Sequence, residues 1–132
     1  DLKVLIRAAD SCFRWGLFDR DPMPYWSQGR VTLLGDACHP MLPFMAQGAV
    51  MGLEDAYTLT RCLQENQDAE AALRRYEGLR RERTAIVQRM ARDNMNFFHN
   101  PDVDNLEEHL NSHRDAHMWL YGFDVTDQEF GA

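Results

Sequence analysis

Apolar and polar positions alternate differently in the first and second halves of the chain. At the start, Leu2, Leu5 and Ile6 recur at helical spacing and indicate the end of a helix. Residues 12–19 then place strand-favouring aromatic side chains on both sides of polar Arg14. This pattern predicts an extended strand directly after the first helix.

Two further segments complete the predicted first half. Residues 20–29 contain two prolines and a glycine, which are typical of a loop. Residues 30–36 form a β-branched and leucine-rich run that stops at a glycine. Because this run is too short for a helix, it predicts a buried strand.

The second half shows the three- and four-residue periodicity of long helices. The first predicted helix runs from Gln47 to about Leu63. Its predicted buried face consists of Val50, Leu53, Tyr57, Thr60 and Leu63. A second helix is predicted to start after a capping Asp68 and to reach about Phe98, before Asn100 and Pro101. Its predicted inner side carries Leu73, Tyr76, Leu79, Ile86, Val87 and Met90.

An arginine-rich stretch of the second helix alternates with Glu77 and Glu82. Its arginines are Arg74, Arg75, Arg80, Arg81 and Arg83. Opposite charges three or four residues apart stabilise a helix surface, so we expect a solvated face with ion pairs in preference to an anion-binding patch. Residues 104–107 then show capping-box spacing for a third helix, and residues 119–126 predict an extended tail packed back onto the body.

Composition narrows the classes of partner and compartment. The 132 residues carry a formal charge of -7, which argues against nucleic-acid binding. They contain neither an apolar run long enough for a membrane span nor an apparent signal peptide, so we expect a single cytoplasmic domain. The three widely spaced cysteines, Cys12, Cys38 and Cys62, predict reduced and mostly buried thiols. Because the chain begins within a helical pattern, we expect a fragment of a longer protein.

Residues 35–56, GDACHPMLPFMAQGAVMGLEDA, carry the candidate chemistry. Asp36 ends a predicted strand, where it can bind a polyol hydroxyl. Pro40 and Pro43 stiffen the following loop, and the small residues 47–50 leave the N–H groups of a helix start accessible to negative charge. Reduced flavin fits this pattern, but so do other nucleotide-like ligands. A plain strand–loop–helix connection, with Asp36 accepting local backbone N–H groups, is the alternative without a ligand.

The motif resembles the second flavin-binding motif of single-component, FAD-dependent aromatic hydroxylases, the p-hydroxybenzoate hydroxylase class. The matching residues are Gly35, Asp36, Ala37, His39, Pro40, Pro43, Gln47, Gly48, Leu53, Glu54, Asp55 and Ala56. With RYEGLRRERT and WLYGFDV, the chain is most similar to the salicylate hydroxylase and 6-hydroxynicotinate 3-monooxygenase branch. The resemblance implies an α/β parent with a Rossmann-like FAD-binding fold, of which this chain is a mainly α-helical part with one or two short strands.

The resemblance also implies an organisation in three parts. Residues 1–29 would end a substrate-domain segment, residues 30–66 would belong to the FAD-binding domain, and residues 67–132 would form a C-terminal helical region. The G-x-G-x-x-G turn that holds the ADP half of FAD is absent from the chain. We therefore expect the isolated chain to be inactive. The alternative function is a free-standing helical interaction module that keeps the motif as scaffold.

Individual roles follow from the same resemblance. The implied cofactor-binding residues are Gly35, Asp36, Ala37, Pro43, Gln47, Gly48, Ala49 and Val50. Asp36 would bind the ribitol of FAD, Pro43 would lie against the isoalloxazine at the catalytic position, and the N–H groups of Ala49 and Val50 would hold the ring. Phe44 and Met45 would line the pocket for a small aromatic acid or serve as core residues. NAD(P)H would be the co-substrate, and the rest of the monooxygenase the partner.

Histidine, methionine and aromatic groups complete the candidates. His39 is expected to make an orienting hydrogen bond in preference to transferring a proton. His109, His113 and His117 share a helix face but lack further ligands, so we expect no metal site. We interpret Met41, Met45, Met51, Met90 and Met95 as core residues. If exposed, an aromatic cluster of Phe97, Phe98, Trp119 and Tyr121 would favour self-association.

Overall fold

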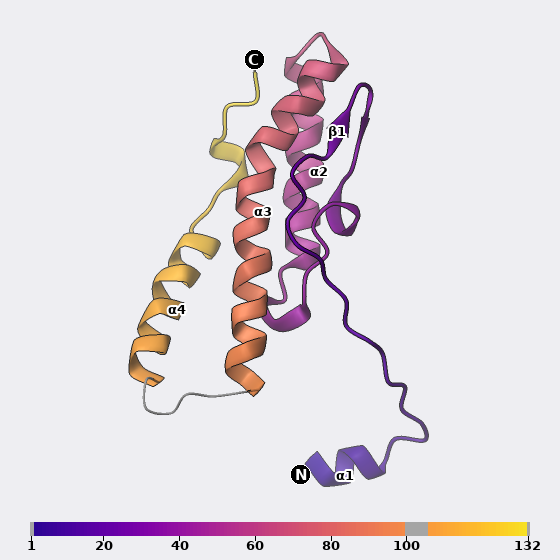
Figure 1. Cartoon of the computed structure of the whole chain (residues 1–132), viewed down its shortest axis with the longest axis vertical. Helices are drawn as coiled ribbons and strands as arrows, with labels where there is room; N and C mark the ends of the chain where they lie inside the picture. Colours follow the sequence, from indigo (N-terminus) through magenta and orange to yellow (C-terminus); the bar gives the residue numbers. More distant parts are fainter. Residues whose placement is uncertain (1, 100–105, 132) are drawn as a thin grey trace.

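A helical hairpin forms the body of the protein, and two shorter helices are attached to it (Figure 1). The computed structural model describes residues 2–99 and 106–131, except the side chains of 106–110, 112 and 113. Its helices and strands are α1 (Leu2–Arg7), β1 (Ser27–Gln28), β2 (Val31–Thr32), α2 (Gly48–Glu65), α3 (Ala69–His99) and α4 (Leu106–Tyr121). Three short 3-10 helices are η1 (Gly35–Ala37), η2 (Pro43–Met45) and η3 (Val125–Asp127). The predicted mainly helical fold with short strands is confirmed.

The long helices begin and end close to their predicted boundaries. α2 starts one residue after Gln47, and α3 ends at His99, one residue beyond the predicted Phe98. The Asp68 carboxylate accepts the backbone N–H groups of Glu70 and Ala71 at 3.4 and 3.0 Å, which confirms its capping role. The capping box predicted at residues 104–107 falls largely outside the described residues.

The predicted buried face of α2 is wrong. Val50, Leu53 and Leu63 are exposed, and the helix instead packs Met51, Asp55, Thr58 and Cys62 inward. The inward face includes two polar residues: Asp55 accepts from Arg80 of α3, and the Thr58 hydroxyl donates to the Glu54 carbonyl within α2. Apolar spacing identified the helix but not the face that its neighbour covers.

The inner side of α3 combines the predicted apolar residues with unpredicted polar ones. Leu73, Tyr76 and Val87 are buried as predicted, whereas Leu79, Ile86 and Met90 are half-buried. The solvated arginine face is only partly correct. Arg74 and Arg81 are exposed and lie near Glu70 and Glu77, but Arg80 and Arg83 are buried. These two arginines belong to the interior of the helical hairpin.

Both strand predictions need correction. Residues 12–19 form no strand and run exposed between α1 and the body (Figure 1). Within the described ranges no strand lies beside them to pair with their backbone, and an unpaired strand is not stable in water. The run 30–36 is not a buried strand either. Only Val31–Thr32 pairs, antiparallel to Ser27–Gln28 in the predicted loop, and Val31 is exposed.

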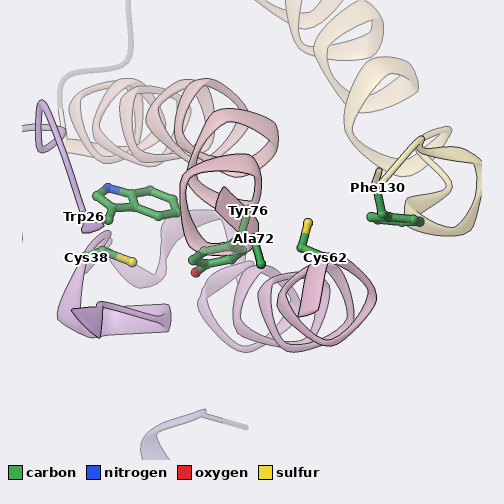
Figure 2. Packing of buried hydrophobic residues seen from close by; sticks show 6 residues of the cluster. All are labelled: Trp26, Cys38, Cys62, Ala72, Tyr76 and Phe130. Carbon is green, nitrogen blue, oxygen red and sulfur yellow. The ribbon is translucent and has the colours of Figure 1, made fainter. Parts of the chain in front are cut away.

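Two clusters of buried side chains make up the core. The first contains Trp26, Cys38, Cys62, Ala72, Tyr76 and Phe130 (Figure 2). The second contains Leu42, Met45, Met51, Val87, Ala91 and Leu120, with Met41, Met90 and Met95 packed against it. The methionine prediction is therefore confirmed. Cys38 and Cys62 are buried free thiols as predicted, whereas Cys12 is exposed.

The C-terminal tail packs back onto the body, as predicted, but is not extended throughout. Residues 119–121 are the last turn of α4, and η3 follows after the three residues 122–124. Leu120 and Phe130 are buried, and the Asn66 side chain donates to the Phe130 carbonyl at 3.0 Å. Two parts of the hairpin are thus covered by residues from the end of the chain.

The four predicted aromatic residues do not form one cluster, although the ring centres of Phe97 and Phe98 lie 6.1 Å apart. Trp119 lies against Arg83, which precedes Phe98 by 15 residues on α3, or about 22 Å along a helix. Phe98, Trp119 and Tyr121 are exposed. None of the helices in the described part of the chain has the length and apolar character needed to cross a membrane.

Candidate functional site

The motif begins with a tight turn that only glycine adopts without strain. Gly35 has φ 61°, in the left-handed region, and its carbonyl accepts the N–H groups of Cys38 and His39, each at 3.0 Å. The resulting 3-10 helix η1 leaves Asp36 and Ala37 exposed between buried Gly35 and Cys38. The carboxylate predicted to bind a ligand is therefore accessible and sits on a fixed backbone.

The buried carboxylate of Asp55, on α2, holds this turn. It accepts the Gly35 N–H at 3.1 Å, and it lies 2.6 Å from His39 Nε2 and 2.7 Å from Arg80 Nε. Burial alone would raise the pKa of Asp55, but the hydrogen bonds from His39 and Arg80 outweigh burial and lower it from its ordinary value. Asp55 therefore stays ionised and ties η1 to both long helices.

A second carboxylate extends this group of charges. Glu54 accepts from Arg80 Nη1 at 2.6 Å and from Arg83 at two atoms, Nε at 2.8 Å and Nη2 at 2.9 Å. The two-atom contact is the geometry that pairs a guanidinium most strongly with a carboxylate. Sequence reasoning missed this role of Arg80 and Arg83. The adjacent acidic pair in the GLEDA sequence was the available signal, since buried arginines need carboxylate partners.

Two amide side chains of α3 hold the proline-containing part of the loop. Gln88 Nε2 donates to the Pro40 carbonyl at 2.9 Å, and Asn94 Nδ2 donates to the Phe44 carbonyl at 3.0 Å. Both amides are buried. Sequence reasoning missed them as well, although buried Arg80, Thr84 and Gln88 recur every four residues on one helix face. The loop is thus fixed by α3 as well as by its prolines.

The fixed loop and the start of α2 border a hollow of about 540 Å³. Gly35, Asp36, Met41, Leu42, Pro43, Ala46, Gly48, Ala49 and Gly52 line it. Five of the eight predicted cofactor-binding residues are among them, and Ala37, Gln47 and Val50 are not. The structure therefore brings Asp36, Pro43 and the first turn of α2 together around one space.

The helix end at the hollow offers backbone donors. No side chain caps α2, and Met51 N–H makes the first of its backbone bonds, to the Gln47 carbonyl at 2.9 Å. The N–H groups of the three preceding residues, Gly48 to Val50, therefore lie ahead of the hydrogen-bond ladder of the helix. A Cβ added to Gly48 would lie 3.9 Å from Asp36 Oδ1. The Asp36 carboxylate therefore lies close to the first residue of α2.

This donor set suits a ligand that carries hydroxyl groups and negative charge, and comparison with known proteins identifies its class. Residues 15–94 match the family model described as FAD binding domain. The chain belongs to this FAD-binding family. The matched residues include the whole hollow and most of α3.

Individual relatives agree with the family assignment. The 6-hydroxynicotinate 3-monooxygenase of Bordetella bronchiseptica is 44% identical over 126 residues, which are 94% of this chain and 29% of that protein. A salicylate hydroxylase substrate complex superposes with a TM-score of 0.70 at 35% identity, covering 85% of this chain and 29% of that one. A variant of Klebsiella pneumoniae HpxO complexed with FAD gives 0.74 at 33% identity, covering 86% and 30%.

These comparisons confirm the resemblance to FAD-dependent aromatic monooxygenases and confirm FAD as the cofactor class. The chain spans about a third of the length of the curated relatives it matches. The residues around the hollow fit one part of an FAD site: an exposed carboxylate, a fixed proline and a helix start. The roles of single residues toward FAD remain predictions.

The two residues considered for a substrate pocket lie differently in this FAD-binding domain. Phe44 is half-buried, with ring centres 6.1 Å from Phe98 and 5.8 Å from His99. Met45 is buried in the second core cluster, where Asn94 Nδ2 lies 2.8 Å from its sulfur. Neither residue lines the hollow. Met45 therefore serves the core, whereas a substrate contact of Phe44 stays a prediction.

His39 makes an orienting hydrogen bond to Asp55, as expected. It also belongs to a group of possible metal ligands that the sequence did not reveal. Its side chain is fully buried, and its ring centre is 5.5 Å from that of Trp26. Cys38, His39 and Asp55 offer three possible metal-ligand atoms within 4.8 Å of one another. Burial raises the pKa of the Cys38 thiol to about 12, and Arg80 already pairs with Asp55. The side chains of His109 and His113 lie outside the described residues.

Proposed function

We propose that this chain supplies the part of an FAD site that faces the ribitol and the ring, in a monooxygenase that hydroxylates a small aromatic or pyridine acid. NAD(P)H and O2 would be the co-substrates. The carrying observation is the hollow where Asp36, Pro43 and the uncapped start of α2 meet. The names of the relatives, 6-hydroxynicotinate 3-monooxygenase and salicylate hydroxylase, support the reaction and substrate class.

Each residue has a physical task in this proposal. The Asp36 carboxylate accepts hydroxyl groups of the ribitol, and its fixed backbone keeps the entropic cost of that contact low. The N–H groups of Ala49 and Val50, at the positive end of α2, stabilise negative charge on the ring. Pro43 borders the hollow and presents a rigid apolar ring to the isoalloxazine. FAD, when bound, supplies the redox chemistry that activates oxygen.

In this proposal, other parts of the enzyme bind the rest of FAD. A G-x-G-x-x-G turn for the ADP half is absent from the 132 residues. We keep the division into a substrate-domain end (1–29), an FAD-domain part (30–66) and a helical region (67–132) as part of the proposal. The isolated chain is then expected to leave the fluorescence of added FAD unchanged. Stoichiometric binding of FAD to these residues would contradict this expectation.

The role of Asp36 is testable in a full-length protein that carries this chain. Asp36→Ala should weaken FAD binding about tenfold, the loss expected for one hydrogen bond to a charged group. Asp93→Ala is the matched control, because Asp93 is an exposed aspartate on α3 outside the hollow lining. Flavin content after purification, read from the absorbance ratio of flavin to protein, measures both variants. Equal flavin content in the two variants would argue against the assigned role.

A further inference from the structure

The end of α4 and the residues after it are fastened to the same buried charges that hold the flavin-facing turn. Arg83 Nη2 donates to the Leu120 carbonyl at 3.1 Å while the guanidinium pairs with Glu54. Its Cζ atom lies 3.8 Å from the centre of the Phe123 ring and 4.9 Å from that of Trp119. We call residues 119–123 the C-terminal clasp.

Aromatic rings lie against the guanidinium of Arg83, one nitrogen of which lacks a hydrogen bond. Arg83 Nη1 is buried and has no hydrogen-bond partner within the described part of the chain. A guanidinium close to the face of an aromatic ring gains electrostatic stabilisation there, and more so where water is excluded. Since Arg83 is 6% exposed, the rings of Phe123 and Trp119 replace water around its charge. The clasp is therefore needed to keep this arginine buried.

From Arg83 a continuous path of polar contacts reaches the turn that carries Asp36. Arg83 and Arg80 share the Glu54 carboxylate, and Arg80 also binds Asp55. Asp55 in turn accepts the Gly35 N–H. Every charged group on this path is buried or nearly so, with Glu54 the most accessible at 12% of its side chain. Low exposure means that moving one group leaves its partner with an uncompensated charge.

An apolar path connects the same two regions independently. The Leu120 side chain belongs to the second core cluster, together with Leu42 and Met45, which flank Pro43 in the loop. Closely packed interiors transmit a displacement because they contain few voids. The C-terminal clasp thus shares a packed cluster with the flavin-facing loop, and it is connected to the turn at Gly35 through the ion pairs of Arg83.

We propose that the C-terminal clasp, through Arg83 and Leu120, positions the turn at Asp36 and the loop at Pro43 for FAD. This inference rests on the proposed function. It assigns Arg83 as a positioning residue, because Arg83 does not line the hollow. The end of the chain then helps to set the geometry of a cofactor site that lies about 85 residues earlier in the sequence.

The test uses a full-length protein carrying this chain, from which FAD is removed and then titrated back. Arg83→Gln should raise the dissociation constant for FAD about tenfold, a size typical of residues that act on a ligand site without contacting the ligand. Arg83→Lys, which keeps the charge toward Glu54, should recover part of the affinity. Arg81→Gln is the matched control, because Arg81 is an exposed arginine of the same helix paired with Glu77. It should bind FAD as the wild type does.

A second variant keeps the inference falsifiable if Arg83→Gln does not fold. Phe123→Leu removes the ring face over Arg83 but retains an apolar side chain, and should weaken FAD binding and shift the absorption bands of the bound flavin. Unaltered FAD affinity and flavin bands in the folded variants would overturn the inference. A wild-type protein that binds no FAD would instead contradict the proposed function. The two failures are therefore distinguishable.

Discussion

The N-terminal segment and the interface between α2 and α3 differ in an unexpected way. The N-terminal segment exposes apolar side chains, whereas the interface buries charged ones. Trp15, in the segment 12–19, is 82% exposed, whereas Arg80, in the middle of α3, is fully buried. Arg80 has Asp55 and Glu54 to neutralise and hydrogen-bond it. Among the residues that the structure describes, none covers Trp15 from solvent. Burial therefore follows the availability of a matching neighbour more closely than hydrophobicity.

The two regions also differ in how many neighbours hold their side chains. The interface residues are held from several sides, and they fix the turn at Gly35. In the segment before the loop, Phe13, Trp15, Leu17 and Phe18 are all exposed. An exposed run of this kind marks an interaction surface or an aggregation risk. The predictions below test the two sides of this comparison, beginning with the largest effect.

Replacing the central arginine should cause the largest loss of stability. Arg80→Met keeps most of the side-chain volume but leaves Asp55 and Glu54 without their shared cation. Breaking a buried ion pair in this way costs about 3–5 kcal/mol. The free energy of unfolding in urea measures the loss. Arg81→Met, at an exposed neighbouring position, should stay within about 0.5 kcal/mol of the wild type. Equal losses in both variants would contradict the distinction between buried and solvated arginines.

Acidic pH should weaken the interface through Asp55. Its pKa is lowered in the folded protein from the ordinary value of 3.8, because the hydrogen bonds from His39 and Arg80 exceed the effect of burial. The stabilisation is therefore fully present above 3.8 and is lost as the pH falls through the lower, folded-state pKa. In unfolding measurements across this range, Asp55→Asn should lack that part of the pH dependence. Parallel profiles for wild type and variant would show that Asp55 does not contribute.

A change in the exposed segment should have the smallest effect on stability. Trp15→Ser removes a large side chain that contributes little packing, so the free energy of unfolding should change by no more than about 0.5 kcal/mol. Self-association of the chain, which remains a prediction, should decrease in the same variant when followed by sedimentation. A large loss of stability in the monomer would mean that this segment packs as tightly as the interface does.

The sequence allowed much of the helical fold, and several of the residues that line the hollow, to be predicted. The starts of α2 and α3 and the Asp68 cap follow from signals only a few residues apart. The motif likewise identified Asp36, Pro43 and Gly48, which the structure places around one space. Gln88 and Asn94 were missed, because a polar residue on a helix gives no sign of a carbonyl about 50 residues earlier that needs a donor.

Strand prediction failed for a related reason. Residues 12–19 have strand-favouring side chains, but a strand also needs a neighbour whose backbone completes its hydrogen bonds. The hairpin of Ser27–Gln28 with Val31–Thr32 formed where a partner was close along the chain. Aromatic and β-branched composition thus describes what a segment prefers, and pairing decides whether the strand exists.

The sequence by itself determined the long helices and the family, because each depends on local geometry or on a motif of about 20 residues. Only the tertiary structure decided which face of α2 is covered and which arginines of α3 are buried. Burying Arg80 has a desolvation cost that is offset only when Asp55, 25 residues earlier, lies within hydrogen-bonding distance. That distance is a property of how α2 packs against α3, which no single helix pattern contains.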